Sequence, residues 1–124
     1  MSERILVIDD EPAIRDFLKL LLDAAGYRVL LAADGATGLL LLEKERGAVN
    51  AVITDLMLPG MQGEEIIREL LSRQPGLGLV VMSGMTEDFP VLAKKYPHCV
   101  LLAKPMTADA LLRSVQSALA QAPA

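Results

Sequence analysis

The chain has no tryptophan, and it carries only two phenylalanines and two tyrosines. Hydrophobic residues still make up 52% of the sequence, which excludes a disordered chain and requires a core of aliphatic side chains. A length of 124 residues is that of one ordinary domain. We therefore expect a single domain over residues 1–124, with no output domain.

Three further absences limit the function. A single cysteine, Cys99, excludes an internal disulfide and suits a reducing cytoplasm. The formal net charge of −4 lacks the basic excess that contacts with nucleic-acid phosphates require. No signal peptide is apparent, and the apolar runs are too short to cross a bilayer. We expect a cytoplasmic protein whose partners are neither nucleic acid nor membrane.

Short apolar runs alternate with segments of helical period along the whole chain. Four of the runs do not alternate with polar residues, which is typical of strands buried on both faces of a parallel sheet: Ile5–Ile8, Ala51–Thr54, Leu79–Met82 and Val100–Ala103. A fifth run, 27–32, carries Arg28 and is expected at a sheet edge. The helix near 87–95 is the least regular, because Pro90 falls inside it. The alternation predicts an α/β domain of (βα)5 form, with helices on both faces of a five-stranded parallel sheet.

Polar residues follow four of the predicted strands: Asp9 and Asp10 the first, Asp55 the third, Ser83 the fourth and Lys104 the fifth. The carboxyl ends of parallel strands meet at one edge of the sheet, so these side chains are expected to gather there. Neighbouring carboxylates repel each other unless a proton or a cation lies between them. Carboxylates beside water are ligands that Mg²⁺ prefers. The pattern predicts a magnesium site at this edge.

Each of these residues also has an ordinary interpretation. Asp9 and Asp10 could be solvated turn residues that cap a helix, Ser83 a turn former, and Lys104 a surface lysine. A flavin or nucleotide carrier could share the fold, but the acidic segment after the first strand would repel phosphate. A phosphatase with an aspartate nucleophile would usually carry a second aspartate at the position of Met57.

Four segments together resemble the receiver domain of two-component response regulators: VIDDE, ITDLMLPGMQG, VVMSG and AKPM, in this order. The resemblance covers essentially the whole chain and implies a flavodoxin-like fold with strand order 2-1-3-4-5. It also implies that Asp55 accepts a phosphoryl group. Asp10, Asp55 and the backbone carbonyl of Met57 would hold Mg²⁺, and Asp9 would act through water or from outside the direct ligands.

The resemblance assigns the remaining roles as well. Ser83 would contact the phosphoryl oxygens, Lys104 would pair with them, and the Lys104–Pro105 peptide bond would be cis. A carboxylate can attack phosphorus, and phosphoryl transfer depends chiefly on positioning and charge neutralisation. The chain would be no enzyme beyond catalysing its own phosphorylation and dephosphorylation. The alternative is a receiver-like docking module that does not rely on phosphorylation.

The same resemblance implies the partners. A sensor histidine kinase or a histidine phosphotransfer protein would donate the phosphoryl group, and a downstream effector protein or a kinase domain of a parent chain would receive the signal. Leu101 departs from the family pattern, because most receivers carry tyrosine or phenylalanine three residues before the lysine. We therefore expect Leu101 to stay packed, with the response to phosphorylation confined to residues 83–95.

Overall fold

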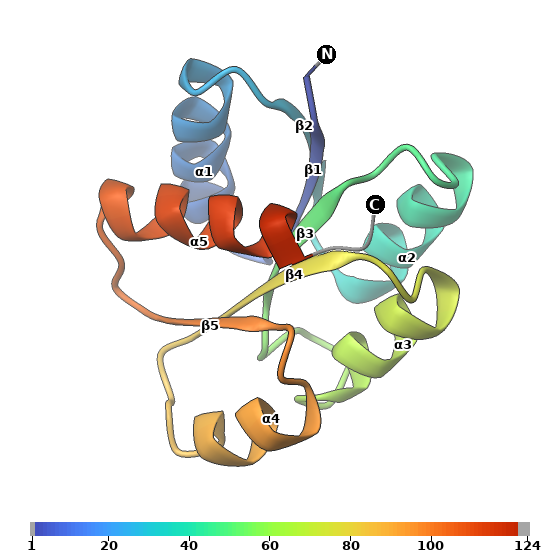
Figure 1. The fold of residues 1–124 in the computed structure, drawn as a ribbon, viewed down its shortest axis with the longest axis vertical. Helices are drawn as coiled ribbons and strands as arrows, with labels where there is room; N and C mark the ends of the chain where they lie inside the picture. Colours follow the sequence, from blue (N-terminus) through green and yellow to red (C-terminus); the bar gives the residue numbers. More distant parts are fainter. Residues whose placement is uncertain (1, 122–124) are drawn as a thin grey trace.

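One parallel sheet forms the centre of the molecule. The computed structural model describes residues 2–121 and places five strands in the order β2-β1-β3-β4-β5 (Figure 1). The strands are β1 (Arg4–Ile8), β2 (Arg28–Ala32), β3 (Ala51–Asp55), β4 (Gly78–Ser83) and β5 (Val100–Ala103). The predicted fold class and strand order are confirmed, and β2 lies at a sheet edge as predicted.

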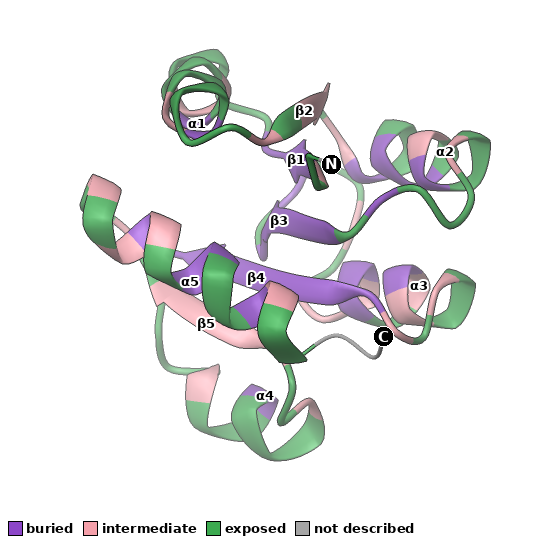
Figure 2. Cartoon of the chain, turned by 45° about the horizontal axis from the view of Figure 1, so that its top comes forward, coloured by how far each residue is buried: buried purple, intermediate pink, exposed green. Residues whose placement is uncertain are grey.

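Five helices cover the two faces of the sheet. They are α1 (Pro12–Ala24), α2 (Gly35–Lys44), α3 (Glu65–Arg73), α4 (Phe89–Lys95) and α5 (Ala108–Gln121). Buried residues of α1 and α5 share one hydrophobic core, and those of α2, α3 and α4 share the other. Figure 2 shows the buried central strands between these two layers of helices.

The two cores explain why the strands show no polar alternation. Successive residues of a strand point to opposite faces of the sheet. In β1, Ile5 and Val7 join the core under α1 and α5, whereas Leu6 and Ile8 join the core under α2, α3 and α4. All four side chains are fully buried, so each of these four positions has to be apolar.

The helix ends follow local sequence signals. Pro12 lies in the first turn of α1, and the backbone turns after that helix at Gly26, where φ is 94°. The Thr107 hydroxyl accepts a hydrogen bond from the Ala110 backbone N–H at 3.1 Å and so caps the first turn of α5. Pro90 lies in the first turn of α4, where its missing N–H needs no helical partner. Helix α4 therefore forms despite this proline, although it is short.

No helix in the described part of the chain combines the length and the apolar character needed to cross a membrane.

Close packing of β4 against α5 leads to a stability prediction. A Cβ atom added at Gly78 would lie 2.7 Å from the backbone carbonyl oxygen of Ala118. The helix backbone cannot shift to relieve this clash as easily as the end of a flexible side chain could. We therefore expect Gly78→Ala to lower the free energy of unfolding by about 1–3 kcal/mol. A Cβ atom at Gly63 would meet nothing within 4 Å, and Gly63→Ala is the matched control. Urea denaturation measures both, and equal stability of the two variants would contradict this packing.

Candidate functional site

The carboxyl edge of the sheet brings together side chains from distant parts of the sequence. Asp9 directly follows β1, Asp55 and Ser83 end β3 and β4, and Lys104 directly follows β5. Asp9 and Ser83 are fully buried, and Asp55 is buried as well. The Lys104 backbone N–H donates to the Ser83 carbonyl at 2.9 Å, so the sheet hydrogen bonding continues up to the site. The predicted gathering of these residues at one edge is confirmed.

Lys104 is the charged centre of the group. Its Nζ lies 2.7 Å from Asp55 Oδ2, 3.2 Å from Asp9 Oδ2 and 3.7 Å from Glu11 Oε1. The Lys104 side chain is only 17% exposed and both aspartates are buried, so water weakly screens the contacts of Lys104 with Asp55 and Asp9. The Lys104–Pro105 peptide bond is cis, as predicted.

Three carboxylates surround this lysine. Oxygen atoms of Asp9, Glu11 and Asp55 all lie within 4.8 Å of one another. Two turns fix them, because Asp9 Oδ1 accepts from the Glu11 N–H at 2.9 Å and Asp55 Oδ1 accepts from the Met57 N–H at 2.9 Å. Asp10 is exposed and is not a member of this group. The structure therefore brings Glu11, to which the sequence reasoning gave no role, next to Asp9 and Asp55.

The pKa values of Asp9 and Lys104 are both raised, for different reasons. Burial raises the pKa of Asp9, and the hydrogen bond from the Glu11 backbone and the charge of Lys104 only partly oppose this rise. Burial alone would lower the pKa of Lys104, but the hydrogen bond and charge of Asp55, together with Asp9, raise it overall. Lys104 is therefore held in its charged form.

The donor set fits a hard divalent cation. Three carboxylates face one lysine, so negative charge remains in excess at this edge. Carboxylate oxygens beside water are the ligands that Mg²⁺ takes in proteins, usually one or two per ion with waters completing the shell. Asp9, Glu11 and Asp55 are thus able to hold Mg²⁺. The roles of Asp10 and of the Met57 carbonyl as ligands stay predictions.

Ser83 is adjacent to Lys104 at this edge of the sheet, but its hydroxyl forms its hydrogen bonds with Met85. Its Oγ donates to the Met85 carbonyl at 2.9 Å and accepts from the Met85 N–H at 3.0 Å. The hydroxyl thus closes the turn that follows β4, and it has to give up the Met85 carbonyl to donate to a new oxygen. Leu101 is partly buried and packs against the core under α2, α3 and α4.

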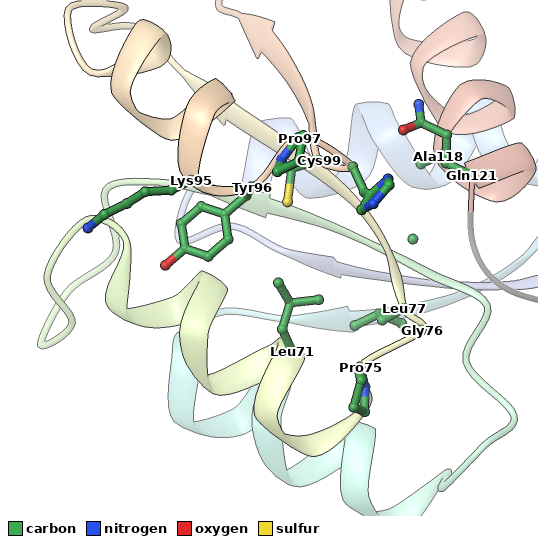
Figure 3. A pocket seen from close by; sticks show the side chains of 12 residues that line it. Leu71, Pro75, Gly76, Leu77, Lys95, Tyr96, Pro97, Cys99, Ala118 and Gln121 are labelled. Carbon is green, nitrogen blue, oxygen red and sulfur yellow. The ribbon is translucent and has the colours of Figure 1, made fainter.

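A separate hollow of about 330 Å³ lies near the amino ends of β4 and β5, away from the acidic edge (Figure 3). Leu71, Leu77 and Cys99 are among its lining residues. Burial raises the pKa of the Cys99 thiol to about 11, so the thiol is protonated and unreactive near neutral pH. This hollow contributes nothing to the acidic site.

Comparison with known proteins decides the family. The model of the response regulator receiver domain matches residues 5–116. The chain belongs to this family. The receiver domain is 36% identical over 119 residues to the transcriptional regulatory protein GlrR of Escherichia coli (strain K12). It is 31% identical over 121 residues to the sensor kinase CckA of Brucella abortus (strain 2308).

These relatives are longer proteins. The match to GlrR covers 94% of this chain but 26% of GlrR, and the match to CckA covers 95% of this chain but 13% of CckA. A solved structure of comparable size is a response regulator receiver domain protein from Clostridium thermocellum. It superposes with a TM-score of 0.86 at 32% identity, covering 95% of this chain and 94% of that one. The receiver domain thus matches one part of each longer relative.

Proposed function

We propose that this receiver domain takes a phosphoryl group from a phosphohistidine donor onto Asp55 in a Mg²⁺-dependent reaction. The observation that carries the proposal is the placement of the Asp55 carboxylate, 2.7 Å from Lys104 and within the acidic group. A nucleophile for phosphorus thus lies beside a fixed positive charge and beside oxygens that can hold a divalent cation.

The chemistry follows from these neighbours. An Asp55 oxygen attacks phosphorus and forms an acyl phosphate, while the bond between phosphorus and the donor's imidazole nitrogen breaks and the imidazole leaves. Mg²⁺, when bound, supplies positive charge against the phosphoryl oxygens. Lys104 moves its hydrogen bond from Asp55 Oδ2 to a phosphoryl oxygen, and Ser83 Oγ donates to another after releasing Met85. The chain then catalyses only its own phosphorylation and dephosphorylation.

The partners follow from the same reaction. The donor is a sensor histidine kinase or a histidine phosphotransfer protein in the cytoplasm, since the chemistry requires a phosphohistidine. The signal passes to a downstream effector protein or to a kinase domain of a parent chain. Similarity to both a transcriptional regulator and a sensor kinase supports either arrangement. The acidic site supports neither a nucleic-acid partner nor a membrane partner.

Acetyl phosphate provides the direct test of this proposal. Incubation of the protein with acetyl phosphate and Mg²⁺ is expected to add the mass of one phosphoryl group, read by intact mass spectrometry. Omission of Mg²⁺ is expected to remove most of this increment. A docking module that does not rely on phosphorylation would show no increment under either condition, and that result would overturn the proposal.

Two substitutions test whether Asp10 or Glu11 binds Mg²⁺. The resemblance assigns Asp10 to the metal, whereas Glu11 lies nearer to Asp9 and Asp55 in the structure. We expect Asp10→Asn to raise the Mg²⁺ concentration for half-maximal labelling by roughly tenfold, because a ligand charge is lost. Glu11→Gln is expected to raise it by only about two- to threefold, because Mg²⁺ takes only one or two protein carboxylates and the resemblance assigns Asp10 and Asp55 to it.

Asp16→Asn is the control for this pair, since Asp16 is an exposed carboxylate on α1. Its half-maximal Mg²⁺ concentration is expected to match that of the unchanged protein. A larger effect of Glu11→Gln than of Asp10→Asn would reverse the ligand assignment.

A further inference from the structure

Apolar burial holds α4 more weakly than the other helices of its layer. The helix has seven residues and one buried side chain, Leu92. The neighbouring helix α3 buries Ile66, Ile67 and Leu70. Figure 2 shows that most of α4 is exposed. Because few apolar contacts fix it, local opening of α4 requires little free energy unless other contacts hold it.

Polar contacts supply a second attachment at the end of α4. The Tyr96 hydroxyl donates to Glu64 Oε2 at 2.7 Å, and Lys95 Nζ lies 3.1 Å and 3.3 Å from the two Glu64 oxygens. In Figure 3 the Lys95 and Tyr96 side chains point in the same direction from the end of α4. These hydrogen bonds, chiefly that from Tyr96, lower the pKa of Glu64, so its carboxylate is charged. The Glu64 carboxylate thus binds both the Tyr96 hydroxyl and the Lys95 ammonium.

Glu64 connects this attachment to the acidic site. It directly precedes α3 and ends the loop of residues 56–64 that follows Asp55. A cavity of about 170 Å³ lies between this loop and α4, lined by Leu56, Glu64, Asp88, Val91 and Leu92. Leu56 is the residue after Asp55, so the cavity gives α4 and the loop room to move relative to each other next to the site.

We propose that Glu64, Lys95 and Tyr96 form a latch that holds α4 in its resting position, and that the latch opens when phosphorylation of Asp55 displaces α4. The second half of this proposal rests on the phosphorylation proposed above, whereas the first half does not. The Tyr96 hydrogen bond is the main component of the latch, because Tyr96 is partly buried while Lys95 is 54% exposed and its ion pair is screened by water.

Hydrogen exchange of the unphosphorylated protein tests the first half. Tyr96→Phe removes one hydroxyl and keeps the ring, and we expect backbone amides of residues 89–95 to exchange about three- to tenfold faster. Tyr27→Phe is the matched control, since it removes a hydroxyl from a partly buried ring beside β2. It is expected to leave the exchange of α4 unchanged.

Two results would overturn the latch. One is unchanged exchange over residues 89–95 in Tyr96→Phe, and the other is a uniform acceleration throughout the sheet, which would report general destabilisation. If Tyr96→Phe does not fold, Glu64→Gln removes the charge and keeps the tyrosine ring, and it is expected to give the same local acceleration. The same two results in Glu64→Gln would again count against the latch.

Beryllofluoride, a phosphoryl analogue, tests the second half. A ligand that favours the displaced helix binds more tightly when the resting state loses a stabilising contact. We therefore expect the beryllofluoride concentration for half-saturation, followed by NMR in the presence of Mg²⁺, to fall about three- to tenfold in Tyr96→Phe and to stay unchanged in Tyr27→Phe. Equal values in all three proteins would overturn the coupling. Failure of the unchanged protein to bind beryllofluoride would refute the proposed phosphorylation and this second half together, while the exchange result still decides the first.

Discussion

Replacement of Asp55 by asparagine is expected to abolish the Mg²⁺-dependent phosphoryl increment. The amide oxygen of asparagine is neutral and a poor nucleophile towards phosphorus, so no acyl phosphate can form at this position. The substitution also removes the negative charge that lies 2.7 Å from Lys104 and shares in holding the cation. Both the attacking atom and part of the cation site are lost, and the labelled fraction should fall to background in intact mass spectra.

Controls separate a lost acceptor from a damaged fold. Asp16→Asn changes an exposed carboxylate on α1 in the same way and is expected to label like the unchanged protein. Asp55→Asn should keep its secondary structure, because Lys104 retains Asp9 as a partner at 3.2 Å. Full labelling of folded Asp55→Asn would show that another residue is the acceptor. Peptide mapping of the labelled protein would then locate that residue.

The sheet and the position of the site could be predicted because buried strand positions have to be apolar, and such runs can be read from the sequence. Residues such as Leu6 and Val7 point to opposite cores, and both cores are apolar, so apolar runs mark the central strands. Once the strands are parallel, the topology alone brings Asp9, Asp55 and Lys104 to one edge. The strand order and the cis bond came from the family resemblance, because periodicity carries no information on either.

Side-chain directions in the loops could not be predicted in this way. Asp10 and Glu11 are adjacent acidic residues after the same strand, and no periodicity distinguishes them. The structure turns Glu11 towards the acidic group through the hydrogen bond from its backbone N–H to Asp9. The contact between Glu64 and Tyr96 spans 32 residues and joins two partly exposed side chains, so neither residue carries a burial signal. Such contacts depend on loop geometry that only the folded chain provides.

Lys104→Met is expected to show the other large effect, a loss of stability that depends on pH and on Mg²⁺. Removal of the ammonium leaves the buried Asp9 and Asp55 carboxylates side by side without their cation. Breaking one partner of a buried ion pair is strongly destabilising, and we expect a loss of about 2 kcal/mol in the free energy of unfolding at pH 7.5 without Mg²⁺. Lys19→Met removes an exposed lysine that lies 2.7 Å from Asp23, and as the control it should cost at most about 0.5 kcal/mol.

The pH dependence identifies the carboxylates as the cause. Burial already raises the pKa of Asp9 above its usual value of 3.8, and loss of the opposing Lys104 charge raises it further. The folded variant therefore binds more protons than the unfolded chain between pH 3.8 and this raised value, so its stability rises as the pH falls through that window. Urea denaturation from pH 7.5 to pH 5 should show the deficit of Lys104→Met shrinking, and added Mg²⁺ at pH 7.5 should shrink it as well, because the cation replaces the lost charge. A deficit that is independent of both pH and Mg²⁺ would mean that Lys104 stabilises the fold through the packing of its stem rather than through its charge.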